Sequence, residues 1–204
     1  MKRYDQVAGF ILAGGASSRM GRDKALLEIG GEPLLVRTAR LLGALVTEVA
    51  VIGPPERYAA LGLRVLPDDV AGLGPLGGIA TALRITSREW NLIVGCDLPY
   101  LSVAWLEWMI ARARNSKSVA LLPETPRGLE PLCAIYRVNC APVITQAIAR
   151  GLRKVTDGLA GLSVERITAA QWGAFDSTGA LFTNLNTRED YAQARAQLEG
   201  KSGT

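Results

Sequence analysis

Residues 11–27, ILAGGASSRMGRDKALL, carry the clearest indication of chemistry in the chain. An apolar run gives way there to small residues, and Arg19, Arg22 and Lys24 follow at once. Small residues let the backbone come close enough to a ligand for its N–H groups to face phosphate oxygens. Arginine and lysine add fixed positive charge. The segment therefore predicts a loop that binds a nucleoside triphosphate, with a plain turn between strand and helix as the alternative.

The two common phosphate-binding patterns do not fit this loop. A Walker loop requires G-x-x-x-x-G-K-[ST], whereas Gly15 and Gly21 are separated by one residue too many. Lys24 comes later and has no Ser or Thr after it. The dinucleotide pattern G-x-G-x-x-G is also missing from this loop. If the loop binds a nucleotide, it does so by a different pattern.

Asp97 is the residue that best suits a metal ion. It follows the apolar run 90–95 and precedes Pro99, which places it at the carboxyl end of a buried strand. Ligands of doubly wound sheets lie beyond those ends, so Asp97 and the glycine-rich loop should face the same crevice. Mg²⁺ at phosphate sites takes one or two carboxylates together with phosphate oxygens and water. We therefore expect Asp97 to hold Mg²⁺; capping of a helix that begins near Ser102 is the alternative.

The composition excludes several other chemistries. The chain of 204 residues has no histidine, which removes Ser-His-Asp triads, imidazole metal ligands and histidine general bases. Its three cysteines have no C-x-x-C spacing, which indicates buried thiols in a reducing cytoplasm rather than disulfides or structural zinc. A net charge of +4 without a dense basic run gives no sign of nucleic-acid binding. The apolar stretches are too short for a membrane span, and the N-terminus is too polar for a signal peptide.

Strand-like and helix-like segments alternate through the first half of the chain. Short, almost wholly apolar runs, typical of strands buried on both faces, cover residues 7–13, 48–53, 63–67 and 90–95. The helices predicted between and after them cover residues 33–45, 75–85 and 102–115. This alternation predicts an α/β fold of three layers, in which helices cover both faces of a doubly wound, mostly parallel, Rossmann-like sheet.

The rhythm is less regular after about residue 122. A strand is predicted over residues 132–136, helices over 141–150 and 155–159, and further strands over 164–167 and 180–186. A final helix is expected to begin at Thr187, with acidic residues in its first turn. No linker or repeat divides the sequence, so residues 1–204 are expected to form a single domain.

Four segments resemble, in order, the signatures of the molybdenum cofactor guanylyltransferase (MobA-like) family of nucleotidyltransferases. LAGGASSRMGRDKALL is similar to L-A-G-G-x-S-x-R-M-G-x-D-K, PDDVAGLGPLGGI to D-(x)5-G-P-L-x-G-I, VGCDLPYL to C-D-x-P, and FTNLNTREDY to F-x-N-x-N-T-P-E-D. Together they span residues 11–191. The resemblance implies the nucleotidyltransferase form of the fold, with a nucleotide-binding half over about residues 1–122 and an acceptor-binding half over about 123–204.

The resemblance also implies a reaction and its residues. With Mg²⁺ as cofactor, the terminal phosphate of molybdopterin would attack the α-phosphorus of GTP and release pyrophosphate. A phosphate monoester, whose second pKa is about 6, needs no general base for this attack. Arg19, Lys24 and Asp97 would be catalytic, with the metal on Asp97. The implied nucleotide contacts are Leu12, Ala13, Gly14, Gly15, Lys24, Asp68, Gly77 and Asp97, and the implied acceptor contacts are Asn184 and Asn186. Molybdoenzyme apoproteins or other cofactor-biosynthesis proteins would be the protein partners.

Some assignments stay open at this level. Asp69 lies beside Asp68, and either aspartate could contact the nucleotide. Gly53 ends the second predicted strand, where guanylyl-transferring members tend to have an Asn that reads the base. The alternatives are therefore a CTP-using molybdopterin cytidylyltransferase or related nucleotidyltransferase, and a non-catalytic partner protein that binds the nucleotide or cofactor. Charged residues around 127–137 are expected to be ordinary surface charges.

Overall fold

The computed structural model describes residues 3–14, 23–69, 72–176 and 179–200. The strands of its main sheet are β1 (Val7–Leu12), β4 (Glu48–Ile52), β5 (Val65–Leu66), β6 (Trp90–Gly95), β7 (Ala120–Thr125), β8 (Gly128–Leu129), β9 (Cys133–Arg137) and β10 (Val164–Ile167). A separate hairpin consists of β2 (Glu28–Ile29) and β3 (Glu32–Pro33). The α-helices are α1 (Leu34–Gly43), α2 (Pro55–Tyr58), α3 (Gly74–Ile85), α4 (Val103–Arg114), α5 (Ala141–Ala149), α6 (Val155–Gly158), α7 (Ala169–Trp172) and α8 (Arg188–Gly200). The 3-10 turns are η1 (Lys24–Leu26), η2 (Ala59–Leu61), η3 (Val138–Cys140) and η4 (Gly173–Phe175).

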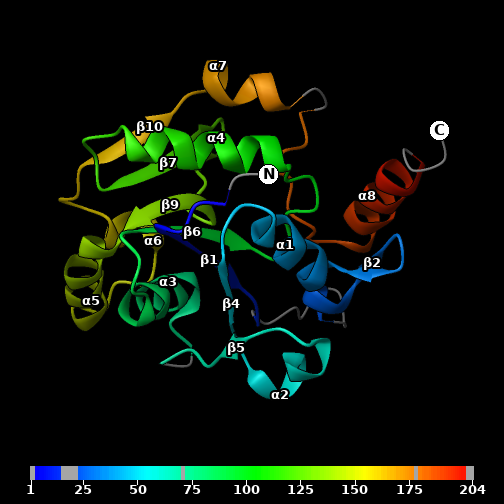
Figure 1. Cartoon of the computed structure of the whole chain (residues 1–204), viewed down its shortest axis with the longest axis horizontal. Helices are drawn as coiled ribbons and strands as arrows, with labels where there is room; N and C mark the ends of the chain where they lie inside the picture. The colour runs from blue at the N-terminus through cyan, green and yellow to red at the C-terminus, as the bar shows by residue number, and fades with distance from the viewer. Residues whose placement is uncertain (1–2, 15–22, 70–71, 177–178, 201–204) are drawn as a thin grey trace.

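The central sheet confirms the predicted α/β class. Its strands follow the order β10-β7-β9-β6-β1-β4-β5 (Figure 1). The short strand β8 pairs with β7. The pairs β1–β4, β1–β6, β4–β5 and β7–β10 are parallel. β9 runs antiparallel to both of its neighbours, β6 and β7. The chain turns back after β7 through a short hairpin, and β9 then fills the place between two strands that precede it.

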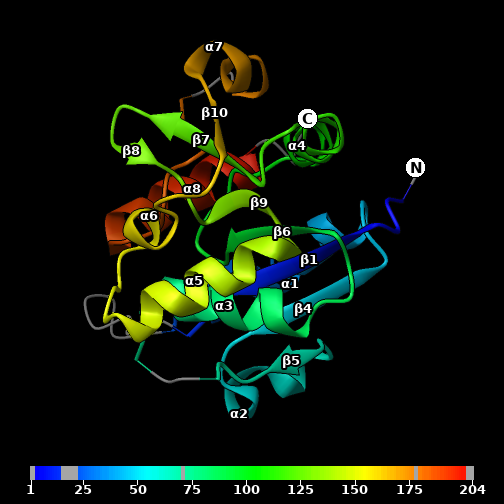
Figure 2. The ribbon, with the colours of Figure 1, turned by 90° about the vertical axis from the view of Figure 1, so that its left-hand side faces the viewer.

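Helices cover both faces of the sheet, with α3 and α5 in front of it in Figure 2. Side chains of β1 alternate between the two cores, as the pleat of a strand requires. Ile11 joins the core under α1 and α4, which includes Leu42 and Trp105. Phe10 joins the core under α3 and α5, which includes Ile79 and Ile144. The continuous apolar strands of the sequence are therefore buried on both faces, as expected.

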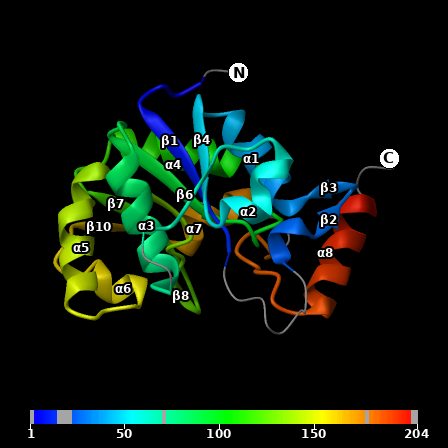
Figure 3. The ribbon, with the colours of Figure 1, turned by 90° about the horizontal axis from the view of Figure 1, so that it is seen from below.

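The end of the chain packs away from the main cores. α8 lies beside β2, on the opposite side of the molecule from α5 and α6 (Figure 3). A third, small core joins them through Leu27, Ile29, Leu34, Leu185 and Ala194. This packing holds the start of α8 against the chain that follows β1.

One predicted element is absent. Residues 180–186 form no strand; they contain a turn closed by a hydrogen bond from Thr183 N to the carbonyl of Ala180. Leu181, Phe182 and Leu185 are nevertheless buried. Apolar residues at nearly alternate positions imitate a strand pattern, but here they enter two different cores instead of one face of a sheet.

The other predicted helices and strands agree closely with the structure. The predicted helices are present within a few residues of their expected ends, and Ser102 caps α4 by accepting a hydrogen bond from Trp105 N at 3.2 Å. All three cysteines are buried thiols without a disulfide. None of the helices in the described part of the chain has the length and apolar character that crossing a membrane requires.

Candidate active site

The carboxyl ends of β1, β4 and β6 lie level with one another. Leu12 pairs in register with Ile52 on one side and with Gly95 on the other. The strand order reverses at this point, because β4 and β5 extend the sheet on one side of β1 and β6 extends it on the other. Crevices at such reversals are the usual ligand sites of open α/β sheets. The segments after these strands therefore meet at one edge.

Lys24 reaches this edge from η1. Its Nζ donates a hydrogen bond to Oδ1 of Asn186 at 2.9 Å and lies 3.7 Å from Oδ2 of Asp97. The Lys24 and Asp97 side chains are only 18% and 25% exposed, so their attraction is less screened than that of a surface pair. Residues that are 162 positions apart in the sequence thus meet beside the end of β6.

Burial raises the pKa of the Asp97 carboxyl, and the nearby Lys24 ammonium opposes the shift. The carboxyl folds back over the strand end, because a Cβ at Gly95 would lie 2.9 Å from Oδ1 of Asp97. The Asp97 carbonyl accepts a hydrogen bond from Leu185 N at 3.0 Å, which ties residues 180–186 to the same edge. Asp97 does not cap α4, since Ser102 does so. A half-buried carboxylate that lies 3.7 Å from one ammonium can accept a further positive charge.

The donor atoms around Asp97 fit a hard cation. A carboxylate and the amide oxygen of Asn186 both lie within a few ångströms of the Lys24 ammonium, and Mg²⁺ prefers oxygen ligands. Within residues 3–14, 23–69, 72–176 and 179–200, no group of three or more acidic or cysteine side chains could hold a metal. Such an ion would therefore depend on Asp97 together with water and ligand phosphates.

Backbone lines the other side of the edge. Gly14 has a φ of +109°, a conformation that favours glycine, and a Cβ there would lie 2.7 Å from Cδ of Pro54. A Cβ at Gly53 would lie 2.5 Å from the carbonyl oxygen of Ala13. Position 53 therefore accepts no side chain in this arrangement. A base-reading Asn at this position is excluded for steric reasons and not only missing from the sequence.

The structure separates the roles of the adjacent aspartates. Asp69 forms an exposed ion pair with Arg84. Asp68 accepts a hydrogen bond from the Thr81 hydroxyl at 2.6 Å, and its Oδ2 lies 3.3 Å from where a Cβ at Gly77 would be. Asp68 thus faces the glycine-rich start of α3, whereas the charge of Asp69 is already paired. This geometry favours Asp68 over Asp69 as a ligand contact.

The start of α3 also reaches β1. A Cβ at Gly78 would lie 3.1 Å from Leu12 Cδ1, so small residues let the helix approach the end of the strand. Five of the candidate residues therefore lie along the edge formed by the ends of β1, β4 and β5: Leu12, Ala13, Gly14, Asp68 and Gly77. The candidates Gly15 and Arg19 lie outside the described residues.

The two asparagines of the C-terminal motif are not on a strand, contrary to the sequence prediction. Asn186 contacts Lys24, whereas Asn184 makes no hydrogen bond to another residue that the structure describes. Sequence reasoning also missed how Asn186 is held. Asp190 Oδ2 accepts hydrogen bonds from the backbone N–H groups of Asn186 and Thr187, at 2.9 and 2.8 Å. The spacing T-x-x-D at residues 187–190, typical of a capping box, was the available signal.

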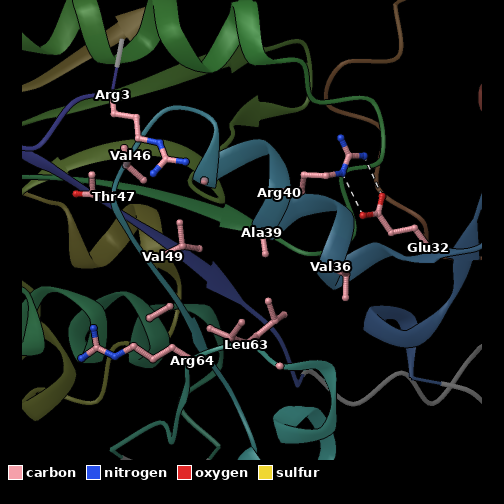
Figure 4. Close-up of a pocket in the computed structure, with 14 residues that line it drawn as sticks. Arg3, Glu32, Val36, Ala39, Arg40, Val46, Thr47, Val49, Leu63 and Arg64 are labelled. Carbon is pink, nitrogen blue, oxygen red and sulfur yellow. Dashed lines mark hydrogen bonds and ion pairs between the residues drawn. The ribbon is translucent and has the colours of Figure 1, made fainter. Parts of the chain in front are cut away.

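A pocket of about 490 Å³ opens elsewhere, between α1 and the β4–β5 edge of the sheet (Figure 4). Its lining includes Arg3, Val36, Val49, Leu63 and Arg64. No residue of the candidate site lines it, and no acidic or nucleophilic cluster faces it; its one carboxylate, that of Glu32, is paired with Arg40. The convergence of charged residues, and not the volume of a cavity, therefore identifies the candidate site.

Comparisons with known proteins identify the family of the chain. Residues 9–164 match the family model described as a MobA-like NTP transferase domain. A protein of Pelotomaculum thermopropionicum, named probable molybdenum cofactor guanylyltransferase, is 35% identical over 195 residues, which cover 95% of this chain and 94% of that protein. A Nostoc protein of the same name is 35% identical over 204 residues, covering 97% and 95%.

Solved structures show the same fold. The crystal structure of molybdopterin-guanine dinucleotide biosynthesis protein A from Archaeoglobus fulgidus superposes with a TM-score of 0.82 at 24% identity. The match covers 97% of this chain and 100% of that one. Taken with the family model and the sequence relatives, the chain belongs to the MobA-like NTP transferase family.

Proposed function

We propose that the protein transfers GMP from GTP to the terminal phosphate of molybdopterin and releases pyrophosphate. The observation that carries the proposal is the meeting of Lys24, Asp97 and Asn186 at the sheet edge where Ala13 and Gly14 begin the loop after β1. The choice of GTP and molybdopterin as substrates rests on the names of the sequence relatives. The three buried free thiols support a reducing compartment such as the cytoplasm.

In this proposal Asp97 holds Mg²⁺ together with phosphate oxygens and water. The ion supplies neutralisation of the charge on the nucleotide phosphates. The fit rests on the half-buried Asp97 carboxylate, whose pKa is raised by that burial although Lys24 lies nearby. Asn184 and Asn186 are the proposed acceptor contacts, and Asn186 would place the acceptor beside Lys24 and Asp97.

The residues of the chain align the two substrates and neutralise the charge on the phosphates. An oxygen of the molybdopterin phosphate forms a bond to the α-phosphorus of GTP, and the bond to the β-phosphate bridge oxygen breaks. The attacking phosphate is already ionised at neutral pH, so no residue has to remove a proton. Lys24 and Arg19 balance the charge that develops on pyrophosphate. The backbone of Ala13, Gly14 and Gly15 and the Asp68–Gly77 contact hold the nucleotide, which supplies the alignment.

Base selectivity is the part of the proposal for which a second candidate has specific support. Because Gly53 accepts no side chain, a base must be read by backbone groups or by neighbours of this position. A CTP-using molybdopterin cytidylyltransferase is therefore the second candidate. Molybdoenzyme apoproteins, or other proteins of cofactor biosynthesis, are the partners expected to receive the product.

The test is pyrophosphate release by the purified protein with Mg²⁺, molybdopterin and GTP, CTP, ATP or UTP in turn. We expect release with GTP at a rate well above the other three, and none when molybdopterin is omitted. Faster release with CTP would replace guanylyl by cytidylyl transfer. Tight nucleotide binding without release from any of the four would instead support a non-catalytic binding protein.

A further inference from the structure

The residue before Lys24 makes contacts that the proposed reaction does not use. Asp23 Oδ1 accepts a hydrogen bond from Ala25 N at 3.0 Å and thereby caps η1. Asp23 Oδ2 accepts a hydrogen bond from the Tyr58 hydroxyl at 2.8 Å. The same oxygen lies 3.6 Å from Nη1 of Arg57. One carboxylate thus connects the turn that carries Lys24 to α2, which lies 35 positions further along the chain at Tyr58.

The segment that donates the hydrogen bond to Asp23 also contacts the chain at the end of β1, where the glycine-rich loop begins. Gly53 and Pro54 precede α2 and pack against Ala13 and Gly14, so closely that neither Gly14 nor Gly53 has room for a Cβ. Residues 53–58, which we name the anchor segment, therefore touch the chain both where it leaves β1 and where it returns at Asp23. Lys24 is held relative to Gly14 through this segment.

Burial makes the Tyr58 contact the strong one. Tyr58 is fully buried, and burial together with the hydrogen bond to Asp23 raises the pKa of its hydroxyl, which stays protonated and donates. The Asp23 side chain is 19% exposed, whereas that of Arg57 is 55% exposed. A hydrogen bond from a buried hydroxyl to a carboxylate is worth more than an exposed ion pair. Tyr58, and not Arg57, is expected to fix Asp23.

We propose that Asp23 and Tyr58 are positioning residues, which place the Lys24 ammonium within reach of a bound triphosphate. The inference rests on the proposed function, because it assigns the effect to the role of Lys24 there. Loss of the Tyr58 hydroxyl removes the buried contact between Asp23 and α2 and leaves the exposed pair with Arg57, so η1 is held less firmly. Lys24 consequently spends less time beside Asp97 and Asn186, and the triphosphate is bound less tightly.

The test is a double-mutant cycle read by calorimetric titration with Mg²⁺ and GTP. Tyr58→Phe keeps the buried ring and removes the hydroxyl, and we expect it to weaken binding about tenfold, the usual scale of a hydrogen bond to a charged group. Lys24→Met should weaken binding further. In the Lys24→Met background, Tyr58→Phe should change affinity less than twofold, because the residue through which Tyr58 acts is gone.

Tyr4→Phe is the matched control. The Tyr4 hydroxyl also donates to a carboxylate, Oε1 of Glu107 at 3.1 Å, but at the opposite edge of the sheet. This variant should leave affinity unchanged. Asp23→Asn is the second variant, should Tyr58→Phe not fold: its amide can accept only one of the two hydrogen bonds, and it should weaken binding in the same Lys24-dependent way.

The outcomes separate the two proposals. Equal weakening by Tyr58→Phe with and without Lys24 would show a general structural effect and overturn the positioning role, as would no weakening at all. If Lys24→Met leaves the binding of GTP, CTP, ATP and UTP unchanged, the role of Lys24 in the proposed function fails as well.

Discussion

At the scale of single residues, Asp97 shows a conflict between stability and function. Burial raises the pKa of its carboxyl, so the fold favours the neutral acid over the carboxylate. The carboxyl therefore adds stability while it is protonated, below the pKa of aspartate in the unfolded chain. That contribution is lost as the pH rises through the raised pKa of the folded protein. At neutral pH the charged carboxylate lowers the stability of the fold, and its attraction to Lys24 offsets only part of this loss.

Asp97→Asn should accordingly separate the two properties. Without nucleotide and Mg²⁺, we expect the variant to melt a few degrees above the unchanged protein at pH 7. The difference should shrink toward pH 4, because the Asp97 carboxyl takes up a proton as the pH falls through its raised pKa. Pyrophosphate release should be lost, because a neutral amide cannot replace the carboxylate. Thermal unfolding at the two pH values, with release assays beside it, checks both parts.

The control for this prediction is Asp5→Asn, an exposed carboxylate at the amino edge of the sheet. It should leave both melting temperature and pyrophosphate release nearly unchanged. A lower melting temperature for Asp97→Asn at pH 7 would mean that the ion pair with Lys24 outweighs the cost of burial, contrary to the prediction.

How well single residues could be predicted depends on the distance over which they act. Gly14 and Asp97 were predictable, because each directly follows an apolar strand and the edge of a parallel sheet gathers such residues. The contact of Asp23 with Tyr58 was not predictable, since nothing in a local pattern identifies a partner 35 positions away. The steric role of Gly53 was also hidden, because it depends on the backbone of a neighbouring strand.

At the scale of elements, the start of α8 holds an acceptor-side candidate in place. Thr187 and Asp190 form a reciprocal cap: Asp190 N donates to the Thr187 hydroxyl at 3.1 Å, and Asp190 Oδ2 accepts from Thr187 N. The hydrogen bonds from the Asn186 and Thr187 amides lower the pKa of Asp190. Its carboxylate thus stabilises the fold above its unfolded pKa, and this stabilisation is lost as the pH falls through the lowered value.

Asp190→Ala should therefore cost about 1 kcal/mol, the usual loss when a helix cap is removed. The cost should be present at pH 7 and fade below about pH 4, the pKa of an unperturbed aspartate. We also expect a raised KM for molybdopterin with a smaller change for GTP, because Asn186 is no longer held. Glu189→Ala, an exposed neighbour in the same turn, is the control and should change neither quantity. Equal effects on both substrates would contradict the acceptor-side role of this turn.

The elements themselves were predictable where one physical signal dominated. Continuous apolar runs identified β1, β4 and β6, and the glycine- and proline-rich start of α3 identified that helix. Residues 180–186 were predicted wrongly, because Leu181 and Leu185 are buried in different cores, and burial alone does not require a sheet neighbour. The antiparallel direction of β9 could not be predicted either, because the apolar pattern of a strand buried between two others is the same for a parallel and an antiparallel strand.

At the scale of the whole molecule, the two halves that we expect to bind the nucleotide and the acceptor share their cores. β9 pairs with β6 across the division at about residue 122, and Ile144 belongs to the same core as Ile79. Gly158 packs so closely on Leu76 that a Cβ there would lie 2.6 Å from Leu76 Cδ1. The site has the same construction, with Lys24 and Asp97 from the first half and Asn186 from the second.

Because neither half can bury its apolar faces alone, we predict that heat unfolds the chain in a single transition. Calorimetric and van't Hoff enthalpies should agree, and tryptophan fluorescence should report the same midpoint as far-ultraviolet circular dichroism. Mg²⁺ and GTP at a hundred times the Kd should raise that midpoint by roughly 5–10 °C, because ligand binding adds about 2.7 kcal/mol to the whole unit. Two resolved transitions, of which the nucleotide shifts only one, would instead show that the halves are separate domains and that the acceptor side folds independently of the nucleotide site.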